Sequence, residues 1–179
     1  MKEVIIYARA GQGAITTAQV LGSAMVKSGL FAYAFPYFGA ARMGAPMNAF
    51  LRYDTKPIRL RSQITFADCA IVVDETLFAS KSPAEQLKID GIAIINSDKK
   101  FSSENGKKIF SVPAAKIAEE IVGKPLANTV LLGVYCFLTK DVSIDFLSEA
   151  MKERFKDKVA QMNISLARAG FDFAAKNFK

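Results

Sequence analysis

The sequence contains no histidine, and it has only two cysteines in 179 residues. Without histidine, the chain cannot supply the Ser-His-Asp or Cys-His group of a nucleophilic enzyme. Cys69 and Cys136 are too few for an ordinary iron–sulfur centre, which is held by four ligands. They lie far apart in apolar segments, so we expect buried free thiols rather than a disulfide. If the protein takes part in redox chemistry, we expect the cofactors on another chain.

Long apolar runs and a secretory leader are also missing from the sequence. No run is long enough to cross a bilayer, and the first residues do not form a signal peptide. Hydrophobic residues make up 51% of the chain, which is enough for a substantial core in a chain of this size. We therefore expect a cytoplasmic protein with no membrane contact, folded as a single domain over residues 1–179.

Acidic residues are outnumbered by basic ones. There are 17 Asp and Glu against 24 Lys and Arg, and the formal net charge is +7. Such a surface favours acidic partners. The basic residues are spread along the chain without an arginine-rich arm or a repeated basic and aromatic pattern, so we expect no nucleic-acid partner. An RNA-binding domain stays open as an alternative interpretation.

Short apolar runs alternate with segments of helical periodicity. The runs predict strands over residues 4–7, 31–35, 47–53, 58–61, 69–73, 91–96 and 109–112. The periodic segments predict helices from Thr16 or Thr17 to residue 28, then over 114–122, 128–139, 144–155 and 159–173. This alternation predicts an α/β fold, a three-layer α/β/α sandwich with a mixed, mostly parallel sheet. We expect the antiparallel part to be a hairpin over residues 47–61.

A loop of small residues, Gly11-Gln12-Gly13, joins the first predicted strand to the first helix. Dinucleotide-binding proteins carry G-x-G-x-x-G at this point and an acidic residue after the second strand. Here Thr16 stands at the third glycine position, and the second strand ends without a carboxylate. We interpret the loop as a tight crossover. A phosphate or carboxylate site formed by its N–H groups and the helix N-terminus stays open.

A second unusual stretch, "FPYFGAARMGAPMNAF", places Arg42 between Gly39 and Gly44. So many apolar residues are unusual in a loop that is free in water. Aromatic residues, methionine and arginine are enriched in interface cores, and a guanidinium binds carboxylates or phosphates in a bidentate manner. We interpret the loop as an interface with a partner subunit, and the same loop can also hold a ligand.

Together these stretches resemble the gamma subunit, or gamma domain, of the 2-oxoacid:ferredoxin oxidoreductases. The family opens on a strand and G-R-G-G-Q-G, where this chain has Ala8-Arg9-Ala10-Gly11-Gln12-Gly13. A family loop of the type P-S-[YF]-G-x-E-x-R-G corresponds to residues 36–44, "PYFGAARMG". The later "NTVLLG" of residues 128–133 is also similar. Alanines at positions 8, 10 and 41 depart from the pattern, so no role is carried over to them.

The resemblance implies a multi-subunit enzyme of the pyruvate or 2-oxoisovalerate type. Such an enzyme converts a 2-oxoacid, most commonly pyruvate, to acyl-CoA and CO2 and reduces ferredoxin, its electron acceptor. Thiamine diphosphate and [4Fe–4S] clusters are then expected on partner subunits of the alpha, beta and delta types. This chain, inactive alone, would have a structural role in assembly, and coenzyme A is a candidate ligand.

The resemblance implies no catalytic residue and no metal ligand on this chain. It implies a cofactor-binding role for Gly11, Gln12, Gly13, Gly39, Arg42 and Gly44. A free-standing nucleotide-binding regulatory protein, with the glycine loop as its site, remains the alternative.

We predict that Arg42 lies at the junction with the thiamine-binding chains, because its loop is apolar and bracketed by glycines. Arg42→Ala should weaken assembly or turnover of the complex and leave the fold of the chain intact. Gel filtration and a turnover assay of the reconstituted complex measure both. Unchanged assembly and unchanged turnover in the variant would remove this role.

Overall fold

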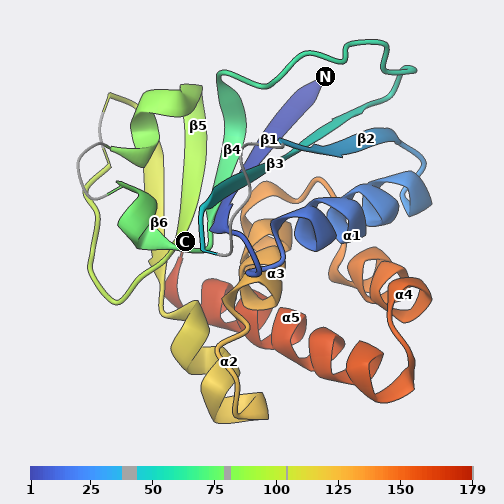
Figure 1. Cartoon of the computed structure of the whole chain (residues 1–179), viewed down its shortest axis with the longest axis vertical. Helices are drawn as coiled ribbons and strands as arrows, with labels where there is room; N and C mark the ends of the chain where they lie inside the picture. Colours follow the sequence, from blue (N-terminus) through green and yellow to red (C-terminus); the bar gives the residue numbers. More distant parts are fainter. Residues whose placement is uncertain (38–43, 79–81, 104, 179) are drawn as a thin grey trace.

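A six-stranded sheet forms the centre of the computed structural model (Figure 1). The structure describes residues 1–37, 44–78, 82–103 and 105–178. In spatial order the strands run β2-β3-β1-β4-β5-β6. Their bounds are β1 Lys2–Arg9, β2 Phe31–Pro36, β3 Pro46–Asp54, β4 Ala67–Val72, β5 Leu87–Asn96 and β6 Lys108–Val112.

The sheet is mixed, as the sequence predicted. Strands β1, β4, β5 and β6 run parallel to one another, whereas β3 pairs antiparallel with both β1 and β2. The α/β class and the mostly parallel sheet are therefore confirmed.

The predicted hairpin over residues 47–61 is wrong, because residues 55–66 form an irregular loop and no strand returns at 58–61. The Arg52 guanidinium donates hydrogen bonds to the carbonyls of Leu60, Ser62 and Gln63. These contacts hold the segment as an irregular loop against β3. The antiparallel character of the sheet comes from the position of β3 between β1 and β2 instead.

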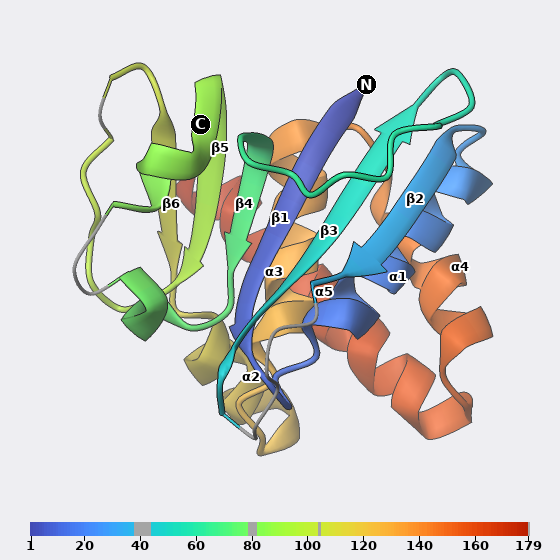
Figure 2. The ribbon, with the colours of Figure 1, turned by 45° about the horizontal axis from the view of Figure 1, so that its top comes forward.

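Five α-helices in the described part of the chain pack on one face of the sheet (Figures 1 and 2). Their bounds are α1 Ala14–Lys27, α2 Ala114–Val122, α3 Ala127–Thr139, α4 Ile144–Arg154 and α5 Asp157–Asn177. Strand residues Val4 and Ile6 join the helical core, and Ile5 and Tyr7 point to the opposite face. This is the alternation expected of a strand that is buried on both sides.

The layer on the opposite face consists of loops and short turns instead of helices. The 3₁₀ turns η1 (Glu75–Phe78) and η2 (Pro83–Gln86) and the loop of residues 55–66 cover it. Phe78 and Ile64 are buried there against β1 and β4. This helix-free face is therefore thin, and part of it lies close to the surface.

The two cysteines and the apolar helix behave as the sequence predicted. Cys69 and Cys136 are buried and free, and α3 is buried over most of its length. Among the described residues, no single helix is long and apolar enough to span a membrane. The pair α2 and α3, bent by 116°, meets the length and composition criteria only when taken together.

Helices α3 and α5 touch through their backbones at two glycines. A Cβ on Gly133 would lie 1.8 Å from the carbonyl oxygen of Ala167, and one on Gly170 would lie 2.0 Å from that of Val130. Nearby, the Thr129 hydroxyl donates to Asn163 Oδ1 over 2.8 Å in the buried interface. The backbones of α3 and α5 therefore lie too close together for any side chain at positions 133 and 170. This contact fixes the position of α5 across α3.

We predict that Gly133→Ala lowers the free energy of unfolding by at least about 2 kcal/mol, because the new methyl group forces the two backbones apart. Urea denaturation followed by circular dichroism measures the change. Gly22→Ala in α1 is the matched control. The tightest contact of its Cβ would be the movable Leu51 Cδ1 at 3.2 Å, with Ala34 Cβ and Ala32 Cβ at ordinary distances of 3.6 and 3.9 Å. Alanine also favours a helix by about 1 kcal/mol. Equal stability of both variants would contradict the backbone contact.

Candidate functional site

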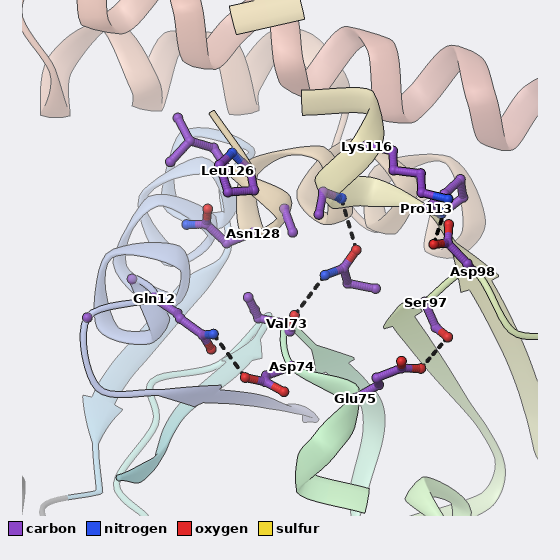
Figure 3. A pocket seen from close by; sticks show the side chains of 16 residues that line it. Gln12, Val73, Asp74, Glu75, Ser97, Asp98, Pro113, Lys116, Leu126 and Asn128 are labelled. Atoms are coloured by element: carbon purple, nitrogen blue, oxygen red, sulfur yellow. Dashed lines mark hydrogen bonds and ion pairs between the residues drawn. The ribbon is translucent and has the colours of Figure 1, made fainter. Parts of the chain in front are cut away.

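A pocket of about 570 Å³ lies at the carboxyl ends of the parallel strands (Figure 3). This edge of a parallel sheet is the usual ligand site of α/β folds, where connections leave neighbouring strands in opposite directions. Here α1 leads from β1 toward β2, and β4 lies on the other side of β1. The lining comes from five segments of the chain, namely Gly11–Gly13, Val73–Glu75, Asn96–Asp98, Pro113 with Ala115 and Lys116, and Pro125–Asn128.

The glycine loop has the conformation that its composition allows. Gly11 and Gly13 have φ values of 97° and 81°, in the left-handed region, and Gly13 is the N-cap of α1. A Cβ on Gly13 would lie 2.9 Å from Asn128 Nδ2. That amide donates to Thr17 Oγ1 over 3.1 Å, and the Thr17 hydroxyl donates to the Gly13 carbonyl over 2.9 Å. Glycine is therefore needed at position 13 for both its conformation and its space.

Asp74 joins the glycine loop to the end of β4. Its Oδ2 accepts from Gln12 Nε2 over 3.0 Å and from Arg9 Nε over 3.1 Å, and its Oδ1 accepts from the Thr76 hydroxyl and N–H. Gln12 Oε1 in turn accepts from the Arg9 N–H over 2.7 Å. Burial on its own would raise the pKa of the Asp74 carboxyl, but the hydrogen bonds from Thr76 and Gln12 and the charge of Arg9 together lower it.

The end of the second predicted motif lies against the glycine loop. Arg9 Nη1 donates to the Gly44 carbonyl over 3.1 Å, and the Ala10 N–H donates to the Ala45 carbonyl over 2.9 Å. The structure thus brings Gly44 next to the loop, whereas Gly11, Gln12 and Gly13 line the pocket itself. Gly39 and Arg42 lie outside the described residues, so their role stays a prediction.

Three helices begin at this pocket. The N-caps of α1, α2 and α3 are Gly13, Pro113 and Leu126, and none of them forms a side-chain cap. Asn96 supports the start of α2, because its Oδ1 accepts from the Ala115 N–H over 2.9 Å. Helix N-termini carry partial positive charge and exposed N–H groups. The arrangement suits an anionic group such as a phosphate.

The charged side chains around the pocket are paired. Lys116 Nζ lies 2.7 Å from Asp98 Oδ2, and the Ser97 hydroxyl donates to Glu75 (Figure 3). Within the ranges that the structure describes, no group of three or more His, Cys, Asp or Glu side chains is placed to hold a metal ion. The chemistry offered by the described lining is that of a binding site.

Sequence reasoning did not assign a role to Arg9, Asp74, Asn96 or Asn128. A usable signal exists for three of them, because Arg9 and Asn96 end the apolar strands β1 and β5 and Asp74 follows β4 closely. Side chains at the carboxyl ends of parallel strands meet at one sheet edge. Asn128 carries no such local signal, because its partner Thr17 is distant in sequence.

One known protein family matches nearly the whole chain. The profile of the pyruvate ferredoxin/flavodoxin oxidoreductase family matches residues 3–173. The chain belongs to this family. Pyruvate synthase subunit PorC of Methanothermobacter marburgensis is 40% identical over 172 residues, covering 96% of this chain and 97% of the relative. The common gamma subunit of the pyruvate/ketoisovalerate oxidoreductases of Pyrococcus furiosus is 38% identical, covering 96% of each chain.

A solved family structure has the same fold. The crystal structure of pyruvate oxidoreductase subunit PORC from Thermotoga maritima superposes with a TM-score of 0.82 at 32% identity, covering 96% of this chain and 97% of that chain. The resemblance on which the sequence interpretation depended is thereby confirmed, over nearly the whole chain. The glycine loop is part of a subunit of the oxidoreductase family.

We predict that Asp74→Asn destabilises the protein by about 1 kcal/mol at pH 7, through weaker hydrogen bonds to Gln12 and Arg9. The folded-state pKa of Asp74 is lowered. Its contribution is therefore present above the unfolded value of about 3.9 and is lost as the pH falls through the lower folded value. The difference between the two proteins should shrink below about pH 4.

Urea denaturation of both proteins at a series of pH values measures this difference. Asp98→Asn is the matched control, because its ion pair with Lys116 is exposed and such pairs contribute little. A difference for Asp74→Asn that stays constant from pH 7 to pH 3 would contradict the role given to the carboxylate.

Proposed function

We propose that this chain is the gamma subunit of a multi-subunit 2-oxoacid:ferredoxin oxidoreductase. The complex oxidatively decarboxylates a 2-oxoacid to acyl-CoA and CO2, and ferredoxin takes the electrons. The observation that carries this proposal is the identity of 38–40% to PorC and common gamma subunits over nearly the full length of both chains. Two free cysteines suit a reducing compartment, so we place the complex in the cytoplasm.

The reacting groups belong to the partner subunits in this proposal. The sequence has no histidine to act as a base. Burial raises the pKa of the Cys136 thiol to about 12 and that of Cys69 further still, so both thiols stay protonated and inert near neutral pH. Subunits of the alpha and beta types would bind thiamine diphosphate, and a delta type would carry the [4Fe–4S] clusters. This chain would organise the assembly.

Pyruvate is the substrate that we propose, since PorC of Methanothermobacter marburgensis is named as a pyruvate synthase subunit. The Pyrococcus furiosus relative is a common subunit of pyruvate and ketoisovalerate oxidoreductases. A subunit that serves two enzymes cannot be the one that separates their substrates. We therefore propose that the choice of 2-oxoacid is made on the partner chains here as well.

The pocket at the ends of the parallel strands is our candidate for a coenzyme A contact. Coenzyme A carries several phosphates, and three helix N-termini face the pocket. Lys116, next to the N-terminus of α2, adds a cation whose present partner is the exposed Asp98. A phosphate can replace that partner with little cost, because exposed ion pairs are weak.

The first test is purification of the tagged chain from its own cells without air, followed by mass spectrometry of the proteins that accompany it. We expect stoichiometric companions that contain thiamine diphosphate and cluster-binding cysteines, with pyruvate-dependent reduction of ferredoxin. A chain that purifies alone with a bound nucleotide would support the regulatory alternative instead.

We predict that Lys116→Gln raises the KM of the complex for coenzyme A about fivefold, which corresponds to about 1 kcal/mol of phosphate binding. The kcat and the KM for pyruvate should not change, because the 2-oxoacid reacts on other chains. Steady-state kinetics of the complex measure all three. Lys152→Gln, an exposed lysine on α4, is the matched control. An unchanged KM for coenzyme A would remove the pocket as its site.

A further inference from the structure

The loop between β3 and β4 crosses the helix-free face of the sheet in front of β1 (Figure 2). We call its residues 55–63 the strap. The strap has no regular secondary structure, and every residue in it except Ile58 is exposed. It contains Lys56, Arg59 and Arg61 and no acidic residue. The strap is therefore a compact cationic segment on the thin side of the molecule.

A buried guanidinium fixes the strap in place. Arg52 of β3 is 1% exposed, and its Nε lies 2.8 Å from Glu3 Oε1 on β1. Its Nη1 donates to the Ser62 carbonyl over 2.6 Å, and the group lies 5.4 Å from the centre of the Phe35 ring. Such a charge-assisted fork holds a defined geometry. The outward side of the strap is therefore preformed, which lowers the entropy cost of binding a partner.

Apolar and aromatic groups accompany the cations. Leu60 is 46% exposed at the centre of the strap. The Arg61 guanidinium lies 4.1 Å from the centre of the Tyr33 ring on edge strand β2, and Tyr33 stacks on Phe35 at 4.8 Å. Among the described residues, Lys56 and Arg59 have no ion-pair partner. Arginine and aromatic residues around an exposed leucine are typical of protein interfaces.

We propose that the strap and Tyr33 form a docking surface for an acidic patch on a partner subunit of the complex. Carboxylates of the partner lie opposite Lys56, Arg59 and Arg61, and an apolar contact covers Leu60. Opposite charges across an interface speed association and fix its register. This inference rests on the proposed function, because the partner it requires is another subunit of the oxidoreductase.

A basic and aromatic surface also suits single-stranded nucleic acid, but the ring contacts favour protein. Bases bind such surfaces by stacking on a free aromatic face. The Tyr33 ring is occupied by Arg61 and Phe35, and Leu60 gains nothing from contact with a phosphate. A protein surface can place carboxylates opposite the three cations and an apolar group over the leucine at the same time.

The first test is zero-length carbodiimide cross-linking of the assembled complex, which joins an amine to a carboxylate only when the two are in contact. Mass spectrometry should identify Lys56 linked to an Asp or Glu of a partner subunit. Lys152, exposed on the helical side, is the control and should form no such link. The proposal is overturned if Lys56 forms no cross-link and stays as reactive toward an acylating reagent as Lys152 does in the complex.

The second test is the double charge reversal Arg59→Glu with Arg61→Glu, co-expressed with the partner subunits. We expect the dissociation constant of the complex to rise at least about tenfold. Lys152→Glu with Lys158→Glu makes the same change in net charge on exposed residues of α4 and α5, and it should leave assembly unchanged. If the double reversal does not fold, Lys56→Glu gives the same test, because no hydrogen bond or ion pair is found for its side chain among the described residues.

The outcomes separate this inference from the proposed function. If the natural chain recovers no oxidoreductase subunits, the proposed function fails. If the natural and the charge-reversed chains assemble equally well, only the strap proposal is overturned. If the reversal abolishes binding to single-stranded RNA and leaves assembly intact, the strap is a nucleic-acid surface, and the proposal is overturned as well.

Discussion

The candidate site depends on the hydrogen bonds that the Asp74 carboxylate accepts. It accepts hydrogen bonds from Gln12 in the glycine loop, from Arg9 at the end of β1 and from Thr76 in η1. Arg9 extends the same network to the Gly44 carbonyl. Segments that are distant in the sequence are thereby held at one sheet edge by charge-assisted bonds. The shape of the pocket beside Gly11–Gly13 follows from this common anchor.

The two faces of the sheet are covered by different kinds of structure. On the helical face, α3 and α5 are in direct backbone contact at Gly133 and Gly170, so no ligand fits between these two helices at their crossing. The opposite face has only loops and 3₁₀ turns over its core. The binding surfaces that we propose lie where the helices are absent or where they begin.

Local patterns in the sequence predicted most of the elements. The predicted helix over residues 114–122 coincides with α2, and the predicted strand over 47–53 lies within β3. Helix α1 begins at Ala14, earlier than the predicted Thr16, because Gly13 in the left-handed conformation turns the chain directly into the helix. The predicted strand at 58–61 is wrong, because the Arg52 side chain binds the carbonyls of Leu60 and Ser62 and holds this segment as a loop. Periodicity carries no information about such a partner.

The site was predictable only in part for the same reason. Gly11, Gln12 and Gly13 could be named from their position between a strand and a helix. Asn128 could not be given a role, because its contact with the glycine loop depends on how α3 sits beside α1.

The anchoring of the strap depends on the pairing of strands β1 and β3. Glu3 and Arg52 lie opposite each other in the β1–β3 pair, and Arg52 binds the Ser62 carbonyl, so the full anchor of the strap exists only where these two strands have paired. In the docking that we propose, a chain without this pairing would present its partner no preformed surface.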